Sequence, residues 1–434
     1  MEEILSRAKK VSEQAEVYRV SSRRTPVQFE ANYLKQIQTK ESTATALRII
    51  KDGRIGFAYV NGPVEPDKLV AMAADTGKFG TRAEFEFPGK TSFPGVEIYD
   101  PEIEDVTLDD MVELGQHFID KIRQHTPEIV CEASVSKGSA SVHIVNSQGG
   151  EAQYRKSFFS FGLEGVIVED GDMLFVGDHL SSCHPVHDFT EALKEITTQL
   201  ELAKKQGAIS TQSMPVIFKP HGVGSALFSP LLTAFNGKIV YNGASPLKDR
   251  LGKQVFDTRF SLWDDATIPY CVASSPCDDE GVPGRKTPLV EHGVVSHFIY
   301  DLQTAGLAHT SSTGNGSRNG GLPAPSSNSV VITEGNVSFD EMVRDIKTGL
   351  IIEDLMGASQ GNVLNGDFSG NVLLGYKIEN GEITGRVKNT MVSGNIYRIL
   401  KQLAAIGNDG RWIGGYLYTP SIYCPDISVA TKEG

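Results

Sequence analysis

Four side chains that can bind a transition metal stand close together in one polar stretch, at His179, Cys183, His184 and His187. Imidazole and thiolate groups are ligands that zinc prefers, and two aspartates flank the stretch. The spacing matches no zinc motif, however. The pattern therefore favours a polar loop between a strand and the helix that follows it, with a metal site as the alternative.

Two other groups of residues could carry acid–base chemistry. His221, in the run Lys-Pro-His-Gly, has no serine or cysteine partner nearby in sequence, so it is interpreted as a turn histidine at the mouth of a cleft. The acidic run Asp278-Asp279-Glu280 precedes Gly281, which marks a turn. Adjacent carboxylates on a turn point in different directions, so the run predicts a solvated or structural turn rather than a calcium site or a catalytic carboxylate pair.

The elements that must position these groups differ between the two halves of the chain. Before residue 210, the apolar pattern predicts helices near residues 4–11, 66–76, 108–124 and 188–206, and strands near 17–20, 43–60 and 130–176. Thr107 is the expected N-cap of the third helix. Asp188 and Glu191 are the expected capping pair of the fourth, with Gly207 as its stop.

After residue 210, strands separated by glycine turns predominate. Asn380-Gly381 predicts a tight hairpin turn, and Ser338 with Glu341 predicts the start of a helix near residues 340–348. The segment 310–329 is rich in Gly, Ser, Asn and Pro, which is typical of a mobile loop over a site or of disorder. The pattern predicts an α+β fold in which an N-terminal α/β region, with amphipathic helices and an antiparallel sheet, precedes a β-rich C-terminal domain. The expected domains are residues 1–105, 106–210 and 211–434.

Composition excludes several classes of function. The 434 residues are 40% hydrophobic and 22% charged, as in an ordinary globular protein, and no apolar run has the length of a membrane span. The net charge of −13 argues against binding to a nucleic-acid backbone. Five scattered cysteines do not make a disulfide framework. The start of the chain lacks a signal-peptide pattern, so a cytoplasmic location is expected.

The glycine- and asparagine-rich run 361–370, the hairpin 375–383 and the run 390–395 together resemble the C-terminal domain of the TldD/PmbA family. This family comprises zinc proteases and their metal-less partner subunits, once called modulators of DNA gyrase. The runs 278–281, 289–301 and 314–318, with Pro323 and Asn328, are similar to further blocks of the family pattern. Residues 52–56 resemble its first-domain hairpin. The resemblance covers most of the chain and is strongest after residue 210.

The catalytic members of this family carry His-Glu-x-x-x-His on a helix and a cysteine near the end of the chain as zinc ligands. The resemblance places Phe228, Ser229 and Thr233 at the three motif positions, and none of them can replace imidazole or carboxylate. Ser229 is instead expected to cap a short helix with Pro230 in its first turn. The loop 407–411 lacks the ligand cysteine, and Cys424 is interpreted as a half-buried structural thiol. No catalytic or cofactor-binding residue is therefore expected in this chain.

The resemblance implies a TldE/PmbA-type subunit without zinc of its own. Its partner would be a TldD-like zinc protease subunit, and their substrate would be an unfolded peptide; the chain is expected to form a heterodimer or a homodimer. Candidate residues for the edges of a shared peptide channel are His221, Asn315, Arg318, Asn365, Asp367 and Asn395. Two alternatives remain open: a self-sufficient metallopeptidase with an unrecognised site, such as the stretch from His179 to His187, and a homodimeric peptide-binding protein.

Overall fold

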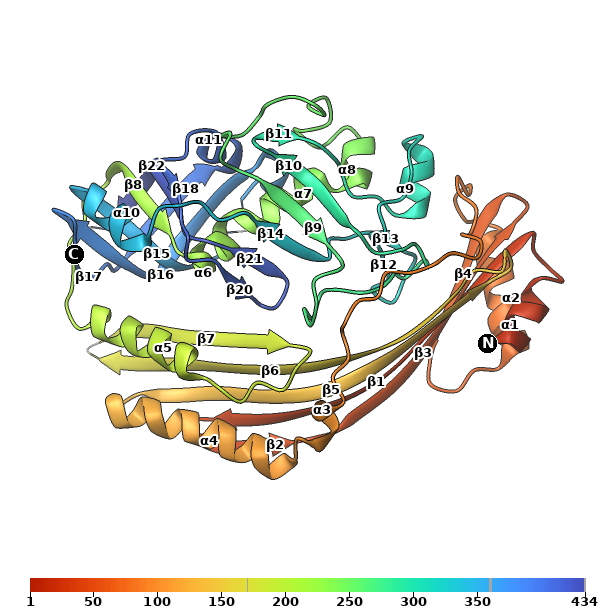
Figure 1. Cartoon of the computed structure of the whole chain (residues 1–434), viewed down its shortest axis with the longest axis horizontal. Helices are drawn as coiled ribbons and strands as arrows, with labels where there is room; N and C mark the ends of the chain where they lie inside the picture. The colour runs from red at the N-terminus through yellow and green to blue at the C-terminus, as the bar shows by residue number, and fades with distance from the viewer. Residues whose placement is uncertain (170, 359–360, 433–434) are drawn as a thin grey trace.

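Long antiparallel strands form the N-terminal part of the computed structural model, which describes residues 1–169, 171–358 and 361–432. Their order is β4-β3-β1-β5-β6-β7, and β2 pairs with β1. The bounds are β1 Gln14–Glu30, β2 Tyr33–Ile37, β3 Lys40–Lys51, β4 Arg54–Asn61, β5 Val130–Asn146, β6 Glu151–Glu169 and β7 Asp172–Ser182. The strands run the length of the molecule (Figure 1). The C-terminal part of the chain packs against one face of this sheet (Figure 1).

Helices lie near both ends of this sheet (Figure 1). At one end are α1 (Glu2–Ala8) and α2 (Pro66–Gly77); toward the other are α3 (Glu102–Asp105), α4 (Leu108–His125) and α5 (Thr190–Ala203). Thr107 is the N-cap of α4, as predicted, because its hydroxyl accepts from the N–H of Asp110, whose carboxylate accepts from the N–H of Thr107 in return. The predicted boundary between residues 105 and 106 falls between β4 and β5, and these two strands belong to the same sheet.

The start of α5 corrects a sequence prediction. Phe189, not Asp188, is the N-cap residue, and it makes no side-chain capping bond. The Oδ1 atom of Asp188 accepts from the N–H of Thr190, while Glu191 lies in the first turn. The ring of Phe189 packs 5.0 Å from that of Phe161 and 6.1 Å from that of Phe118. Asp188 therefore does cap a first-turn N–H, one residue before the N-cap position, whereas Glu191 makes no return bond to Asp188 among the described residues.

The C-terminal part contains a seven-stranded sheet in the order β15-β8-β22-β18-β16-β17, in which β19 also pairs with β22 and β15 also pairs with β16. Its strands are β8 Gln212–Phe218, β15 Thr348–Met356, β16 Asp367–Glu379, β17 Glu382–Arg386, β18 Thr390–Asn395, β19 Ala405–Ile406 and β22 Ile422–Thr431. Asn380 and Gly381, with φ of 52° and 80°, make the predicted tight turn between β16 and β17.

Smaller sheets and short helices complete this part. A six-stranded sheet has the order β11-β10-β9-β14-β21-β20, and β12 pairs with β13. The strands are β9 Leu262–Asp265, β10 Lys286–Glu291, β11 Val294–Val295, β12 Gly316–Ser317, β13 Ala324–Pro325, β14 Ser329–Ile332, β20 Arg411–Ile413 and β21 Leu417–Thr419. The helices are α6 Pro220–Val223, η1 Gly224–Phe228, α7 Ser229–Phe235, α8 Gly237–Tyr241, α9 Leu302–Leu307, α10 Phe339–Asp345, η3 Val363–Asn365 and α11 Ile396–Lys401. Ser338 and Glu341 form the predicted capping box of α10.

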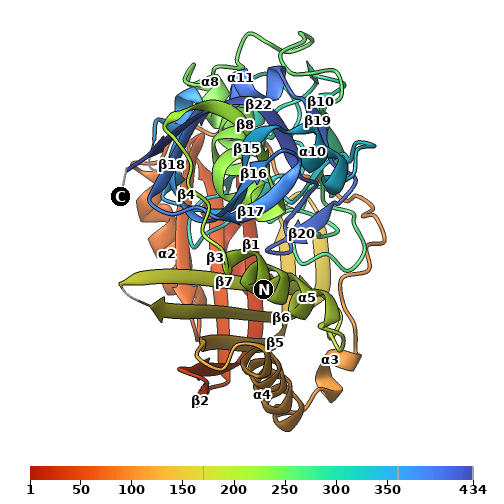
Figure 2. The same cartoon turned by 90° about the vertical axis from the view of Figure 1, so that its left-hand side faces the viewer.

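The two parts share a hydrophobic core. The C-terminal strands lie over the face of the N-terminal sheet (Figures 1 and 2). One buried cluster includes Phe161 of β6 and Ile196 of α5 together with Ile351 of β15 and Tyr376 of β16. The predicted α+β class, with an N-terminal antiparallel sheet and a β-rich C-terminal part, is confirmed. Within the described residues, no helix combines the length and the apolar character that crossing a membrane requires.

Candidate functional site

A continuous helical run formed by α6, η1 and α7 contains Phe228, Ser229 and Thr233, the residues that the sequence resemblance assigns to the zinc motif. Ser229 has helical dihedral angles and helix on both sides, so the prediction that it caps a helix is wrong. Pro230 follows it and has no N–H to donate to the preceding turn. The wider π-helical turn of η1 lies directly before this point. The helical run therefore continues through Pro230 although this residue donates no backbone hydrogen bond.

These three residues do not fit a zinc ion. The ring of Phe228 lies 5.4 Å from that of Tyr416 and offers no lone pair. The Thr233 hydroxyl donates to the Ser229 carbonyl at 2.8 Å. In the loop where the family's cysteine would stand, the Asp409 carboxylate accepts from the N–H and the hydroxyl of Ser421. Across residues 1–169, 171–358 and 361–432, no three His, Cys, Asp or Glu side chains are grouped as metal ligands.

Cys424 is also unsuited to metal binding. Its side chain is fully buried in β22 rather than half-buried as predicted, and burial raises the pKa of the thiol. A thiol held in its protonated form is a poor metal ligand. Its role as a structural thiol is therefore consistent with its position.

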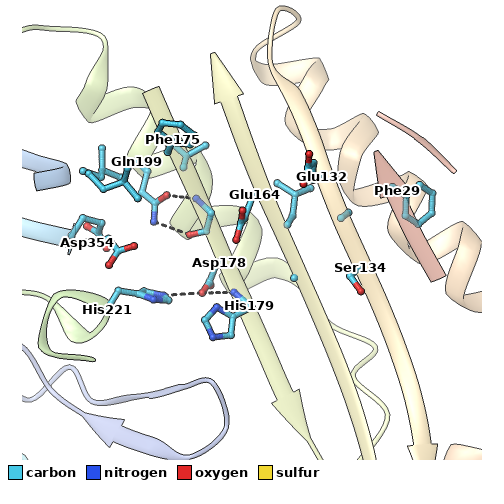
Figure 3. A pocket seen from close by; sticks show the side chains of 18 of the residues that line it. Phe29, Glu132, Ser134, Glu164, Phe175, Asp178, His179, Gln199, His221 and Asp354 are labelled. Carbon is cyan, nitrogen blue, oxygen red and sulfur yellow. Dashed lines mark hydrogen bonds and ion pairs between the residues drawn. The ribbon is translucent and has the colours of Figure 1, made fainter. Parts of the chain in front are cut away.

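The four possible ligands between residues 179 and 187 do not converge. The Nδ1 atom of His184 lies 2.6 Å from the Asp100 carboxylate, and its ring stacks on Tyr270 at 3.5 Å. Cys183 is buried and His187 is exposed. His179 points in another direction, toward His221 (Figure 3). The arrangement is that of a polar connection between β7 and α5, the interpretation favoured from sequence.

A cavity of about 620 Å³ lies between the face of the N-terminal sheet and the C-terminal strands. Residues of β5, β6 and β7 line one side of it, and His221 of α6, Glu353 and Asp354 of β15, and Leu374 of β16 line the other. Figure 3 shows His221 reaching toward Asp178 and His179 across this space. The cavity thus brings together side chains that are far apart in the sequence.

Asp178 is the centre of a buried network beside the cavity. Its fully buried carboxylate accepts two hydrogen bonds from Arg411, at 2.8 and 2.6 Å, and lies 3.2 Å from Nε2 of His221. Burial opposes ionisation of Asp178, but the hydrogen bond from His221 and the charge of Arg411 outweigh burial and lower the pKa of this carboxyl. Burial lowers the pKa of His179. The surroundings therefore favour the ionised form of Asp178 and the neutral form of His179.

The network continues through Lys219, which bridges Glu195 of α5 at 2.7 Å and Glu353 of β15 at 2.8 Å. Burial disfavours the charge on Lys219, but the two carboxylates more than compensate and raise its pKa. Burial raises the pKa of Glu353 to about 7; the charge of Lys219 opposes this shift, and the charge of Glu195 adds to it. The residues of this network are far apart in the sequence, so their contact could not be predicted from spacing. One signal was available: Glu353 and Asp354 directly follow the apolar run 350–352.

The six channel candidates fall in three places. His221 lines the cavity on the short helix α6 rather than on a turn. Asn365, Asp367 and Asn395 lie together, because the Asn395 amide donates to the Asn365 carbonyl and the Asp367 carboxylate, both at 2.8 Å. This polar cluster is near α7, since η3 packs against that helix.

The other two candidates, Asn315 and Arg318, are buried elsewhere. The Asn315 amide donates to Asp264 at 2.7 Å, and Arg318 pairs with Glu16 of β1. The segment 310–329 contains β12 and β13 and is held by such bonds, so the expectation of a mobile or disordered loop does not describe it.

The sequence predicted that the acidic turn 278–280 is either solvated or structural. In the structure it is structural. Asp278 accepts from the N–H of Gly316 at 2.8 Å, and Glu280 pairs with Arg48 of β3 at 2.6 Å. Both carboxylates are buried. Burial raises the pKa of Asp278 well above its ordinary value, and the charge of Glu280 adds to this effect. The turn therefore connects the C-terminal part to the N-terminal sheet.

Family models match three parts of this chain. The PmbA/TldA metallopeptidase C-terminal domain matches residues 211–431, the central domain matches residues 101–194, and domain 1 matches residues 15–76. The first of these alone spans more than half of the chain.

Individual relatives agree with this result. The chain is 28% identical over 428 residues to an uncharacterized protein of Methanocaldococcus jannaschii, covering 97% of this chain and 98% of the relative. It is 31% identical over 222 residues to the metalloprotease PmbA of Escherichia coli O157:H7, covering 51% and 47%. The crystal structure of TldE from Thermococcus kodakarensis superposes with a TM-score of 0.90 at 25% identity, covering 99% of each chain. The chain therefore belongs to the PmbA/TldD metallopeptidase family.

Proposed function

We propose that this chain is the non-catalytic, TldE-type subunit of a heteromeric metalloprotease that cleaves unfolded peptides. The observation that carries the proposal is the helical run 220–235, on which Phe228, Ser229 and Thr233 occupy the positions that the sequence resemblance assigns to the zinc motif. The likeness to TldE over the whole chain supports it. The zinc ion would be held by a TldD-like partner that carries His-Glu-x-x-x-His.

In such a complex this chain would form one side of the channel through which the peptide reaches the zinc ion. The polar cluster of Asn365, Asp367 and Asn395 offers donors and acceptors beside α7, where the catalytic relatives carry their motif. Amide and carboxylate groups of this kind can bond the main chain of an extended peptide without selecting its sequence. A wall that excludes water would also strengthen electrostatic interactions at the partner's metal.

A cytoplasmic location belongs to the same proposal. Cys131, Cys183, Cys271, Cys277 and Cys424 are all free and buried. Free thiols are typical of proteins kept in a reducing compartment.

Co-expression with a TldD-like chain tests the proposal. We expect the two chains to co-elute in size-exclusion chromatography, and zinc measured by mass spectrometry to follow the amount of partner. Peptide cleavage should require both chains and should disappear when glutamine replaces the partner's motif glutamate. A chain purified alone that holds stoichiometric zinc and cleaves the peptide would overturn the proposal, as would failure of the two chains to associate.

A further inference from the structure

One border of the N-terminal sheet is open. Residues 36–42, which span the end of β2 and the start of β3, follow β1 in one antiparallel register. On their other side, β4 pairs with β3 only from Ala44 onward, and no strand in the described parts of the chain lies beside residues 36–42. Figure 2 shows β2 at the lower border of the sheet. Residues 36–42 are called the free edge below.

Three residues of the free edge direct their main-chain groups away from the sheet. The N–H of Gln38 donates to β1, whereas the Thr43 carbonyl, just beyond the free edge, accepts from the residue that follows β4 on the other side. Successive residues of a strand alternate in this respect, so the N–H and carbonyl groups of Ile37, Thr39 and Glu41 point outward. Within the part of the chain that the structure describes, no other element bonds these groups.

The other border strands of this sheet are covered. In β7, the Gln199 amide bonds both the N–H and the carbonyl of Gly177. In β4, the Thr76 hydroxyl bonds both main-chain groups of Phe57. Proteins cover strand edges in such ways because an unpaired edge pairs readily with another chain. The free edge has no comparable cover among the described residues, and every residue in it is exposed.

The side chains along the free edge restrict what can pair with it. Ile37 is 41% exposed, and Tyr33 and Leu34 at the start of β2 are 73% and 45% exposed, which favours contact with another protein. Lysine on an edge strand commonly prevents strand pairing, and Lys40 lies in the free edge. A strand that pairs here must therefore place a neutral or acidic residue opposite Lys40.

A second copy of the free edge meets this requirement. Two copies that pair antiparallel about a twofold axis at Thr39 place Ile37 of one copy opposite Glu41 of the other. All three outward residues of each copy then form hydrogen-bonded pairs. Lys40 lies opposite Gln38, and Thr39 lies opposite its own counterpart, so no like charges are directly opposed.

Neighbouring registers satisfy fewer of these conditions. An axis at Lys40 would place two lysines opposite each other, which is unfavourable. An axis at Gln38 would place Glu41 opposite Lys35, where the register of β2 with β1 is interrupted. A second copy also presents its edge as a strand already, whereas an unfolded segment would lose conformational entropy on pairing.

We propose that the free edge is a self-association surface, on which a second copy of this chain pairs antiparallel about Thr39 and joins the two N-terminal sheets. Pairing through one short edge makes a small contact, so monomer and dimer should exchange at roughly micromolar concentrations. The inference does not depend on the proposed function, because the free edge contains no residue of the helical run 220–235.

Cysteine cross-linking of the full-length chain tests the register. Directly opposed residues of a hydrogen-bonded pair have Cα atoms about 5.5 Å apart, which a disulfide can span. We expect Thr39→Cys to form a covalent dimer with diamide, which takes up the two thiol hydrogens and is reduced to its hydrazine. The matched control Ser42→Cys should not cross-link, because its two copies would lie about 20 Å apart along the strands. The native cysteines are all buried.

Sedimentation velocity measures association without a cross-link. Wild type should change from monomer to dimer between about 1 and 100 µM. Thr39→Pro removes an outward N–H that β1 does not use, and it should weaken association at least about tenfold. Thr39→Val keeps this N–H and should change association by less than about threefold.

Several results would contradict the proposal: a wild-type chain that stays monomeric over this range, a dimer that persists in a folded Thr39→Pro variant, or equal cross-linking of the two cysteine variants. Circular dichroism shows whether Thr39→Pro keeps its strands. If it does not, the comparison of Thr39→Cys with Ser42→Cys decides alone, because neither variant removes a main-chain group.

Discussion

A single buried carboxyl, Asp264 of β9, gives the fold a defined pH dependence. Its side chain is 1% exposed and accepts from the amides of Asn315 and Asn328 at 2.7 and 3.0 Å. Burial outweighs these bonds and raises its pKa to about 6. The native state therefore binds this proton more tightly than the unfolded chain. Its contribution to stability is complete below the ordinary aspartate range and is lost as pH rises through about 6.

Replacement by Asn removes this titration. We expect the difference in unfolding free energy, wild type minus Asp264→Asn, to fall by about 2 kcal/mol between pH 4 and pH 7. Urea titrations at several pH values measure it. The control Asp249→Asn makes the same change of charge at an exposed position. A difference that rises with pH would show that the carboxylate form is the one the fold prefers.

Residue types alone decide some points about the site. That Phe228 and Thr233 cannot replace imidazole followed from the chemistry of their side chains. The burial of Asn315 and Arg318 did not, because polar residues in a glycine-rich segment are usually solvated. Their partners, Asp264 and Glu16, lie 51 and 302 positions away. Contacts between residues so far apart in the chain cannot be predicted from the local sequence pattern.

At the scale of elements, the edge strand β7 is protected by a side chain of α5. Gln199 is 2% exposed, accepts from the N–H of Gly177 at 2.9 Å and donates to its carbonyl at 3.2 Å. The amide thus takes the place of a neighbouring strand at this point. The variant Gln199→Ala leaves these main-chain groups without their partner and should lower the unfolding free energy by about 1–3 kcal/mol.

Hydrogen exchange provides the direct readout for Gln199→Ala, because the amide of Gly177 should exchange faster than in wild type. The control Gln116→Ala removes an amide of α4 that bonds only the nearby Asp120 on the surface, and it should change stability by less than about 0.5 kcal/mol. Unchanged exchange at Gly177 in the Gln199 variant would mean that the strand edge is protected in another way.

The sequence predicted secondary structure correctly where the backbone conformation depends on neighbouring residues. The turn at Asn380-Gly381 needs positive φ at both positions, and the capping box of Ser338 and Glu341 closes within one turn. Both predictions are confirmed. At α5 the prediction holds in part, because Asp188 accepts from the Thr190 N–H while the N-cap position falls one residue later, at Phe189. A difference of one residue at a helix end is not readable from local sequence.

At the scale of the whole molecule, a buried ion network joins the N-terminal sheet to the C-terminal part. Arg48 of β3 lies between Glu16 of its neighbour β1, at 3.1 Å, and Glu280 of the acidic turn, at 2.6 Å. The rings of Phe85 and Phe87 lie within 5 Å of its guanidinium. The shared apolar core around Phe161 joins the same two parts at another place. The network and the core are therefore two separate connections.

The variant Arg48→Met tests whether the network makes the two parts unfold together. It leaves the buried Glu280 without its cation, whereas Glu16 keeps its pair with Arg318. Removing one partner of a buried ion pair typically costs about 3–5 kcal/mol. Both tryptophans, Trp263 and Trp412, lie in the C-terminal part, so their fluorescence reports that part, whereas circular dichroism reports all strands. For wild type we expect the two signals to change at the same urea concentration.

In Arg48→Met the circular dichroism transition should begin at lower urea than the fluorescence transition, because the N-terminal sheet loses one of its connections to the C-terminal part and opens first. The control Arg23→Met removes an exposed arginine of β1 that lies 3.4 Å from Glu41, and its two transitions should coincide. If both signals of Arg48→Met shift together to lower urea, the network adds stability but does not couple the parts. The apolar core would then be sufficient to hold the sheet and the C-terminal strands as one unit, and the cavity between them would keep its shape without the ion network.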